Sequence, residues 1–258
     1  MSEAAEPVVL VERRERVLVV TLNRPDARNA INLAVARAIA AALDQLDADS
    51  GLLVGILTGV PPGFSAGMDL KAFAAGELPL TQERGFAGLA DRGPRKPLIA
   101  AVEGFALAGG FEVVLACDLV VAGRDARFGL PEVTRGLFAF GGGLVRLPRR
   151  IPANVAAEIA LTGETASAER LHALGLVNRL VEAGHAVEGA LELAATIAAN
   201  SPLGVRITKD VLGRQRSWSA DEAADEQAVL REEVLAAPDA HEGAQAFAEK
   251  RAARWATE

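Results

Sequence analysis

Cysteine is nearly absent from this chain, since Cys117 is the only one among 258 residues. A single cysteine excludes an internal disulfide, and its place in an apolar stretch predicts a packed thiol rather than a reactive one. Histidine is also scarce, and His172, His185 and His241 lack the spacing of metal ligands. We therefore expect neither a disulfide framework nor a metal site.

Long runs of one charge and long apolar runs are missing as well. The chain has 27 basic and 34 acidic residues, a formal net charge of −7, so nucleic acid is not expected as a partner. No segment reaches the length of a membrane span, and Met1 to Pro7 lacks the apolar stretch of a signal peptide. These absences predict no membrane partner and a cytoplasmic location.

Apolar residues make up half of the chain, which is enough for a sizeable core. No internal repeat is visible. The Ser201-Pro202 pair marks a boundary, so we expect a core over residues 1–200 and a helical region over 201–258.

Hydrophobic periodicity predicts strands first and helices later in the chain. The expected strands cover residues 8–12, 17–22, 52–57 and 98–102. The expected helices begin at Asn29 and otherwise cover residues 111–117, 154–161, 168–174, 186–199, 203–212, 221–236 and 240–255. Glycines and prolines punctuate residues 72–97, which predicts a mobile segment that could cover a ligand.

Chemistry is indicated most strongly by the helix predicted after Gly109 and Gly110. This helix is apolar on nearly every face apart from Glu112, and an ionised carboxylate in such surroundings is costly unless it has a purpose or a partner. The glycines would let a ligand atom approach the backbone N–H groups at the helix start. The plainer alternative is a glutamate that only matches the helix dipole.

Glu132 is the second candidate carboxylate. It follows a valine-rich strand, in a loop opened by Gly129 and fixed by Pro131, so it could return to the neighbourhood of Glu112. Two carboxylates in one polar cavity could divide acid and base roles, because burial and like charge separate their pKa values. Leu-Pro-Glu is also an ordinary turn.

A second loop of small residues precedes Met68, which would expose another backbone amide there. The same loop contains Gly63-Phe64-Ser65-Ala66-Gly67, the G-x-S-x-G pattern of serine hydrolases. Pro61-Pro62 separates this pattern from the strand, whereas a nucleophile elbow turns directly from strand to helix, so we weigh a hydrolase as the lesser alternative. His172 and Asp118 are expected to be structural.

Six motifs in order resemble the crotonase, or enoyl-CoA hydratase/isomerase, superfamily over nearly the whole chain. They are Leu22-Asn23-Arg24-Pro25 with Asn29-Ala30, the segment Phe64 to Leu70, the segment Gly104 to Glu112, Cys117-Asp118, Phe128 to Glu132, and Phe247 to Arg251. The resemblance implies an α/β fold built as a spiral of ββα units, with a C-terminal helical oligomerisation region that forms trimers or dimers of trimers. It also implies an acyl-CoA thioester substrate and no separate cofactor.

The resemblance assigns roles to individual residues. The backbone N–H groups of Met68 and Gly109 would form an oxyanion hole for the thioester oxygen. Glu112 and Glu132 would hold the water that a hydratase adds across the 2,3 double bond of an enoyl-CoA. The coenzyme A contacts implied are Arg28, Ala66, Asp69, Leu70, Lys71 and, from a neighbouring subunit, Lys250.

One departure from the hydratase pattern lies after Glu132. Hydratases often have Pro-Gly-Ala-Gly-Gly there, whereas this chain has Ala139-Phe140-Gly141-Gly142-Gly143. Phe138 and Phe140 are therefore predicted to line the acyl pocket, and Phe140 could crowd the water. The alternatives are a carnitinyl-CoA dehydratase-like activity, suggested by Leu144 to Pro148, an enoyl-CoA isomerase, and an acyl-CoA-binding subunit without turnover.

Overall fold

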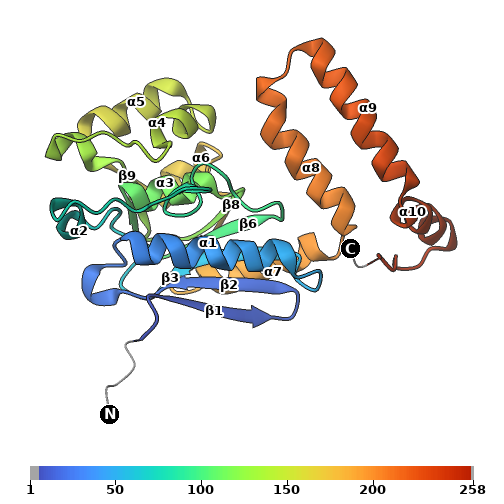
Figure 1. Ribbon diagram of the computed structural model, residues 1–258, viewed down its shortest axis with the longest axis horizontal. Coiled ribbons are helices and arrows are strands. Elements are labelled where there is room, and N and C mark those ends of the chain that lie inside the picture. The colour runs from blue at the N-terminus through green and yellow to red at the C-terminus, as the bar shows by residue number, and fades with distance from the viewer. Residues whose placement is uncertain (1–5, 257–258) are drawn as a thin grey trace.

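The computed structural model describes residues 6–256 (Figure 1). The ends of both predicted regions, 1–5 of the core and 257–258 of the helical region, lie outside the described residues. The stretch Met1 to Pro7, for which we expected no signal peptide, is described only from Glu6 onward.

The core is organised by a six-stranded sheet in the order β1-β2-β3-β6-β8-β11. Its strands are β1 (Val9–Arg14), β2 (Val17–Leu22), β3 (Val54–Gly59), β6 (Leu98–Val102), β8 (Leu119–Gly123) and β11 (Arg179–Val181). The first two predicted strands pair antiparallel as the hairpin β1-β2, and every other pairing in this sheet is parallel. Parallel strands are typical of sheets covered on both faces.

Successive side chains of these strands pack alternately into two hydrophobic cores, one on each face of the sheet. On β2, Leu18 and Val20 pack in the core that includes α1 (Leu33–Ala48), while Val17 and Val19 pack in the core that includes α7 (Ala186–Ala198). This alternation follows from the two-residue period of a strand. The inner strands β2, β3, β6 and β8 are thus enclosed between helices (Figure 1), whereas the edge strand β1 is mostly exposed.

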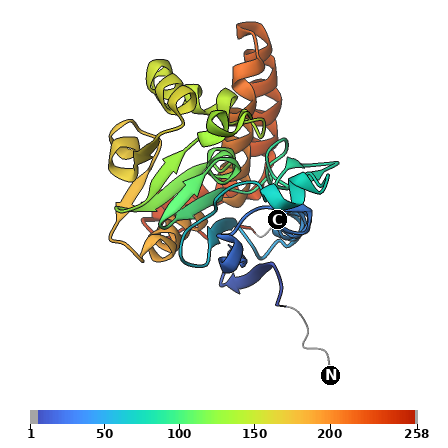
Figure 2. The same cartoon turned by 90° about the vertical axis from the view of Figure 1, so that its left-hand side faces the viewer.

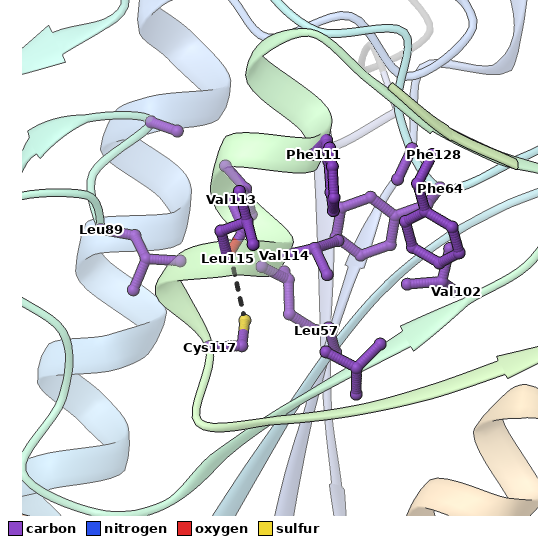
Figure 3. Close-up of a cluster of buried hydrophobic side chains, with 14 of the residues drawn as sticks. Leu57, Phe64, Leu89, Val102, Phe111, Val113, Val114, Leu115, Cys117 and Phe128 are labelled. Atoms are coloured by element: carbon purple, nitrogen blue, oxygen red, sulfur yellow. Dashed lines mark hydrogen bonds between the residues drawn. The ribbon is translucent and has the colours of Figure 1, made fainter. Parts of the chain in front are cut away.

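A smaller sheet carries the segments with the predicted chemistry. It has the order β10-β9-β7, from β7 (Phe105–Leu107), β9 (Arg127–Gly129) and β10 (Thr165–Ser167). Helix α3 (Gly109–Ala116) follows β7 and is buried on nearly all sides, as predicted (Figure 3). Its Phe111 ring packs against Phe128 of β9, with ring centroids 5.4 Å apart.

Short elements connect these layers. The helical ones are η1 (Pro25–Ala27), α2 (Leu70–Ala74), η2 (Pro131–Arg135), α4 (Gly143–Arg146), η3 (Leu147–Arg149), α5 (Ala153–Thr162) and α6 (Ala168–Ala173). A two-stranded ribbon joins β4 (Leu80–Thr81) to β5 (Gly85–Phe86).

The C-terminal helices form an arm that extends beyond the core in both views (Figures 1 and 2). The arm consists of α8 (Pro202–Arg214), η4 (Gln215–Ser217), α9 (Ala220–Ala236) and α10 (Pro238–Glu249). At its base, Lys209 pairs with Asp118 at 2.6 Å, and the Trp255 indole N–H donates to the Ala199 carbonyl at 2.7 Å. The arm is therefore fastened to the core near its root.

Two predicted helix boundaries were wrong. The first helix begins at Leu33 rather than Asn29, because the Asn32 side chain accepts from the Val35 amide and caps it there. The last helix ends at Glu249 rather than Trp255, because Lys250 takes a left-handed conformation with φ 55° and stops it.

Part of residues 72–97, the segment predicted to be mobile, is packed against the core. Residues 84–90 are buried, and the Arg84 guanidinium lies 2.6 Å from Asp44 of α1. Gly88 lies so close to α1 that a Cβ there would be 2.1 Å from the Ala36 carbonyl oxygen. Gly88 therefore permits the close approach of this segment to α1.

The residues assigned to structure are structural. The Cys117 thiol is buried, and burial raises its pKa to about 12. Asp118 accepts from the Leu98 amide and pairs with Lys209, and the His172 ring lies 2.8 Å from the Val177 carbonyl oxygen. Within residues 6–256, no helix is long and apolar enough to cross a membrane.

Candidate active site

The two predicted amides are brought together by single-residue bridges between loops. Ser65 pairs with Ala106 at the end of the loop before Met68, and Met68 itself pairs with Ile31. The first bridge places the Met68 loop beside the turn from β7 into α3. An added Cβ at Gly109 would lie 3.3 Å from the Met68 nitrogen, so the two amides are neighbours.

Neither of these amides is used by the fold. Among residues 6–256, the N–H groups of Met68 and Gly109 donate to no backbone or side-chain acceptor. The Gly109 amide is free because the first residue of a helix has no intrahelical acceptor. Two neighbouring unpaired donors form a site that can bind one oxygen atom.

The turn that presents Gly109 has an unusual backbone. Ala108 takes φ 49° and ψ −128°, a region that residues with a Cβ rarely occupy. It is held there because its N–H donates to the Gly129 carbonyl at 2.9 Å. Close approach also explains Gly110, where a Cβ would lie 2.5 Å from the Ser65 carbonyl oxygen.

Glu112 is buried in the first turn of α3, with 2% of its surface exposed. Its Oε1 accepts from the Gly143 amide at 2.8 Å, and the Gly141 amide also faces the carboxylate. Burial raises the pKa of Glu112 to about 7, and the charge of Glu132 adds to the rise. The Gly143 and Gly141 amides and Arg146 oppose it.

Glu132 reaches the same region because β7 and β9 run parallel. Leu107 pairs with Gly129, so the chain leaves both strands at one edge of the small sheet and continues to α3 on one side and η2 on the other. Burial raises the pKa of the Glu132 carboxyl. Its Oε2 is buried without a hydrogen-bond partner among the described residues, which makes it available to a ligand or water.

Phe86 is a site residue that sequence reasoning missed. Its ring lies against both glycine positions, since a Cβ at Gly109 would be 2.4 Å from Phe86 Cζ and one at Gly141 2.7 Å from Cδ1. The Phe140 ring stacks edge-on against it with centroids 5.6 Å apart. The available signal was Phe86 standing between Gly85 and Gly88, which we interpreted as a mobile stretch.

The predicted pocket aromatics lie beside this ring. Phe138 and Phe140 are 63% and 39% exposed, and their centroids are 6.3 Å apart. Phe86, Phe140 and Phe138 thus form a continuous aromatic row from the Gly109 turn to the surface. Phe138 and Phe140 remain predictions as residues that contact an acyl group.

Most of the residues predicted to contact coenzyme A lie near the Met68 loop, and one, Lys250, lies on the arm. Those near the Met68 loop are Arg28, Ala66, Asp69, Leu70 and Lys71, and the Ala66 amide donates to the Arg28 carbonyl at 3.0 Å. The Arg28 and Lys71 side chains are exposed.

Asp69 and Lys250 differ from the rest of that set. The Asp69 carboxylate is already occupied, because it caps α2 and pairs with Arg24 at 3.0 Å. Lys250 lies on the arm, where it ends α10 in a left-handed conformation. All of these contacts stay predictions.

The alternative nucleophile has no catalytic setting. The Ser65 hydroxyl is fully buried, donates to the Asn29 carbonyl at 2.8 Å and accepts from the Gly67 amide at 3.1 Å. It stabilises the loop that presents Met68. Within the described part of the chain, no cluster of three or more histidine, cysteine, aspartate or glutamate side chains could hold a metal ion.

Comparison with known proteins agrees with this geometry. The sequence profile of the enoyl-CoA hydratase/isomerase family matches residues 12–258. The chain belongs to this family. Its fold is the mixed α/β crotonase fold with C-terminal helices, which confirms the predicted fold class.

Several relatives cover almost the full length of this crotonase. A crystal structure of an enoyl-CoA hydratase from Mycobacterium marinum superposes with a TM-score of 0.96 at 56% identity, covering 98% of this chain and 100% of that one. A mevalonyl-coenzyme A hydratase from Aspergillus fumigatus is 42% identical over 99% of this chain and 98% of its own. An enoyl-CoA hydratase from Mycobacterium tuberculosis is 41% identical over 95% of each chain.

A large cavity of this crotonase lies away from the paired glutamates. It has a volume of about 920 Å³ and lies between the C-terminal end of α3, the stretch from Arg146 to Arg150, and α8 of the arm. Its walls are mixed, with apolar Leu115 and Leu212 beside the cations. We assign the chemistry to the glutamate pair, because unpaired amides and carboxyls with raised pKa values meet there.

Proposed function

We propose that this crotonase is an enoyl-CoA hydratase, a hydro-lyase that adds water across the 2,3 double bond of a 2-enoyl-CoA thioester. The observation that carries the proposal is the convergence of the unpaired Met68 and Gly109 amides with the buried Glu112 carboxyl and the half-buried Glu132 carboxyl. Relatives at 56% and 41% identity are enoyl-CoA hydratases, which supports the same activity here.

The two amides act on the thioester oxygen. When water adds at C3, the electron pair of the double bond moves toward this oxygen, which develops negative charge. Fixed dipoles stabilise that enolate more than the neutral carbonyl, so the barrier falls selectively. One donor of this kind contributes about 3 kcal/mol in comparable oxyanion sites.

The two glutamates move the protons. Ionised Glu112 takes a proton from the water as its oxygen bonds to C3, and protonated Glu132 delivers a proton to C2. Burial raises the pKa of both carboxyls, and the pKa of Glu112 near 7 lets it accept a proton at neutral pH. The reverse sequence dehydrates a 3-hydroxyacyl-CoA.

Arg28, Ala66, Asp69, Leu70 and Lys71 are the coenzyme A contacts of this proposal, with Lys250 approaching from a neighbouring subunit. Since the Asp69 carboxylate is occupied by Arg24 and the α2 cap, its contribution would come from the main chain. Phe138 and Phe140 line the acyl pocket, and the reaction needs no separate cofactor.

Assembly into a trimer or a dimer of trimers is part of the proposal. The arm exposes large apolar side chains, among them Leu212 at 66%, Val229 at 68% and Phe247 at 86%. Exposed apolar groups on projecting helices favour burial against other subunits.

The direct test is turnover of purified protein on a panel of 2-enoyl-CoAs that includes straight, branched and carnitine-derived acyl groups. Loss of the absorbance of the conjugated thioester measures hydration. Tight binding of CoA esters without turnover on any member would instead support a binding subunit. Movement of the double bond without water addition would support an isomerase.

A further inference from the structure

Arg146 is a half-buried cation that the proposed chemistry does not use. It is the last residue of α4, and its Nη1 donates to the Gly141 carbonyl at 3.2 Å while Nη2 donates to the Ala90 carbonyl. These two carbonyls belong to segments far apart in the sequence. One is the turn 141–143, and the other ends the packed segment 84–90.

Both segments form walls of the candidate site. The turn donates its Gly143 amide to Glu112, and the packed segment carries Phe86, whose ring lies against Gly109 and Gly141. The Arg146 guanidinium therefore connects two walls of the site. One is the turn 141–143, which hydrogen-bonds Glu112, and the other is the packed segment 84–90, whose Phe86 lies against Gly109. The planar guanidinium of arginine can donate to two fixed acceptors at once. The ammonium group of lysine, at the end of a flexible side chain, does not match that geometry.

The fit around this guanidinium is close. A Cβ at Gly142 would lie 1.9 Å from Arg146 Nη1, and Gly142 has φ 95°. The three consecutive glycines of the turn thus leave room for Glu112 and Phe86 on one side and for Arg146 on the other. Because the turn 141–143 has no side chains, its conformation depends on contacts with Glu112, Phe86 and Arg146.

We infer that Arg146 is a positioning residue for hydration: by bridging the Gly141 and Ala90 carbonyls, it holds the glycine turn that orients Glu112. This inference rests on the proposed function, because it concerns the same glutamate. It assigns Arg146 no contact with substrate.

The charge of Arg146 gives a second, separable effect. Glu112 is faced by Glu132 from η2, by the Gly141 and Gly143 amides, and by Arg146 from α4. Arg146 is faced in turn by Asp91, Glu112, Arg149 and the Cys117 thiol. Since Arg146 lowers the pKa of Glu112, neutralising it raises that pKa and moves the acid limb of the kcat/KM profile to higher pH.

The experiment compares R146Q, R146K and the control R149Q in the full-length protein. Arg149 is exposed, lies three positions further along, and donates to neither the turn nor the packed segment. We expect R146Q to lose about tenfold to a hundredfold in kcat and to shift its acid limb upward. R146K should keep the acid limb near that of the parent yet lose part of kcat, and R149Q should match the parent in both.

The outcomes separate this inference from the proposed function. Parent-like kcat and pH profile in R146Q, or equal losses in R146Q and R149Q, would overturn it while the parent still hydrates enoyl-CoA. If R146Q does not fold, as judged by thermal unfolding, then R146K decides, and an unchanged kcat in R146K overturns the inference. Failure of the parent on every thioester contradicts the proposed function instead.

Discussion

Glu112 combines deep burial with hydrogen bonds that favour its charge. At 2% exposure an ionised carboxylate is costly, yet the Gly143 amide and Arg146 offset part of that cost and leave its pKa near 7. A group that titrates near neutrality both accepts and releases protons readily. Glu132 differs because one of its oxygens is buried without a partner.

The first prediction is that Glu112→Gln and Glu132→Gln each lose at least about a hundredfold in kcat on the best enoyl-CoA. Glutamine keeps the size of the side chain but cannot exchange a proton. The same variants should still bind a CoA ester, which fluorescence titration or calorimetry would measure. Near-parent rates in both variants would remove the assigned proton transfers.

The second prediction concerns stability against pH. A carboxyl with a raised pKa in the folded state stabilises the fold below its unfolded pKa, near 4.5, and that stability is lost as pH rises through about 7. Glu112→Gln should therefore be more stable than the parent at pH 8, by up to about 3 kcal/mol, and similar to it at pH 4. Urea unfolding at both pH values measures the difference, and an equal offset at both would contradict the assignment.

Elements meet at this site through backbone pairing rather than side-chain contacts alone. Pairing of Leu107 with Gly129 sets α3 beside η2, and the bridge between Ser65 and Ala106 sets the Met68 loop beside both. The spacing of the two amides is thus a property of strand register. Sliding β9 by one residue would turn its side chains to the opposite face.

The third prediction tests the glycine turn. A Cβ in Gly141→Ala would lie 2.8 Å from Glu112 Oε2 and 2.7 Å from Phe86 Cδ1, so one of them must move. We expect about a tenfold to hundredfold loss in kcat, because small displacements of a catalytic group are costly. Gly93→Ala is the control, since its nearest contact would be 3.8 Å from Leu89. Equal activity of the two variants would show that the turn tolerates the displacement.

Periodicity predicted most of these elements because a buried strand or helix face leaves a regular apolar pattern. The apolar face of α1 and the all-round apolar α3 are examples. The packing of residues 84–90 was missed because it depends on contacts with α1, such as Arg84 with Asp44, which no local pattern reveals. Phe86 and the bridging role of Arg146 were missed for the same reason.

At the scale of the whole molecule, the candidate site lies in the core and the exposed apolar surface lies on the projecting arm. The core provides both amides and both carboxyls from residues 68–132, whereas α8, α9 and α10 provide exposed apolar surface. The resemblance predicted an α/β crotonase fold with C-terminal helices, and the fold confirms that prediction. Subunit number depends on contacts between chains, which neither periodicity nor one chain's packing defines.

The fourth prediction is that the purified protein has three or six times the mass of one chain in light scattering after size exclusion. Val229→Asp should reduce that mass, because it places a charge on a side chain that is 68% exposed on α9. Gln227→Glu, also exposed on α9, is the control and should leave the mass unchanged. A monomeric parent would contradict the proposed assembly.

The return of Trp255 to Ala199 has a practical consequence for labelling experiments. A fluorophore attached beyond the described C-terminal residue, Ala256, would start at the root of the arm and report on the core. One placed on η4, between α8 and α9, would instead follow the far end of the arm. Energy transfer between these two positions would measure the bending of the helical hairpin.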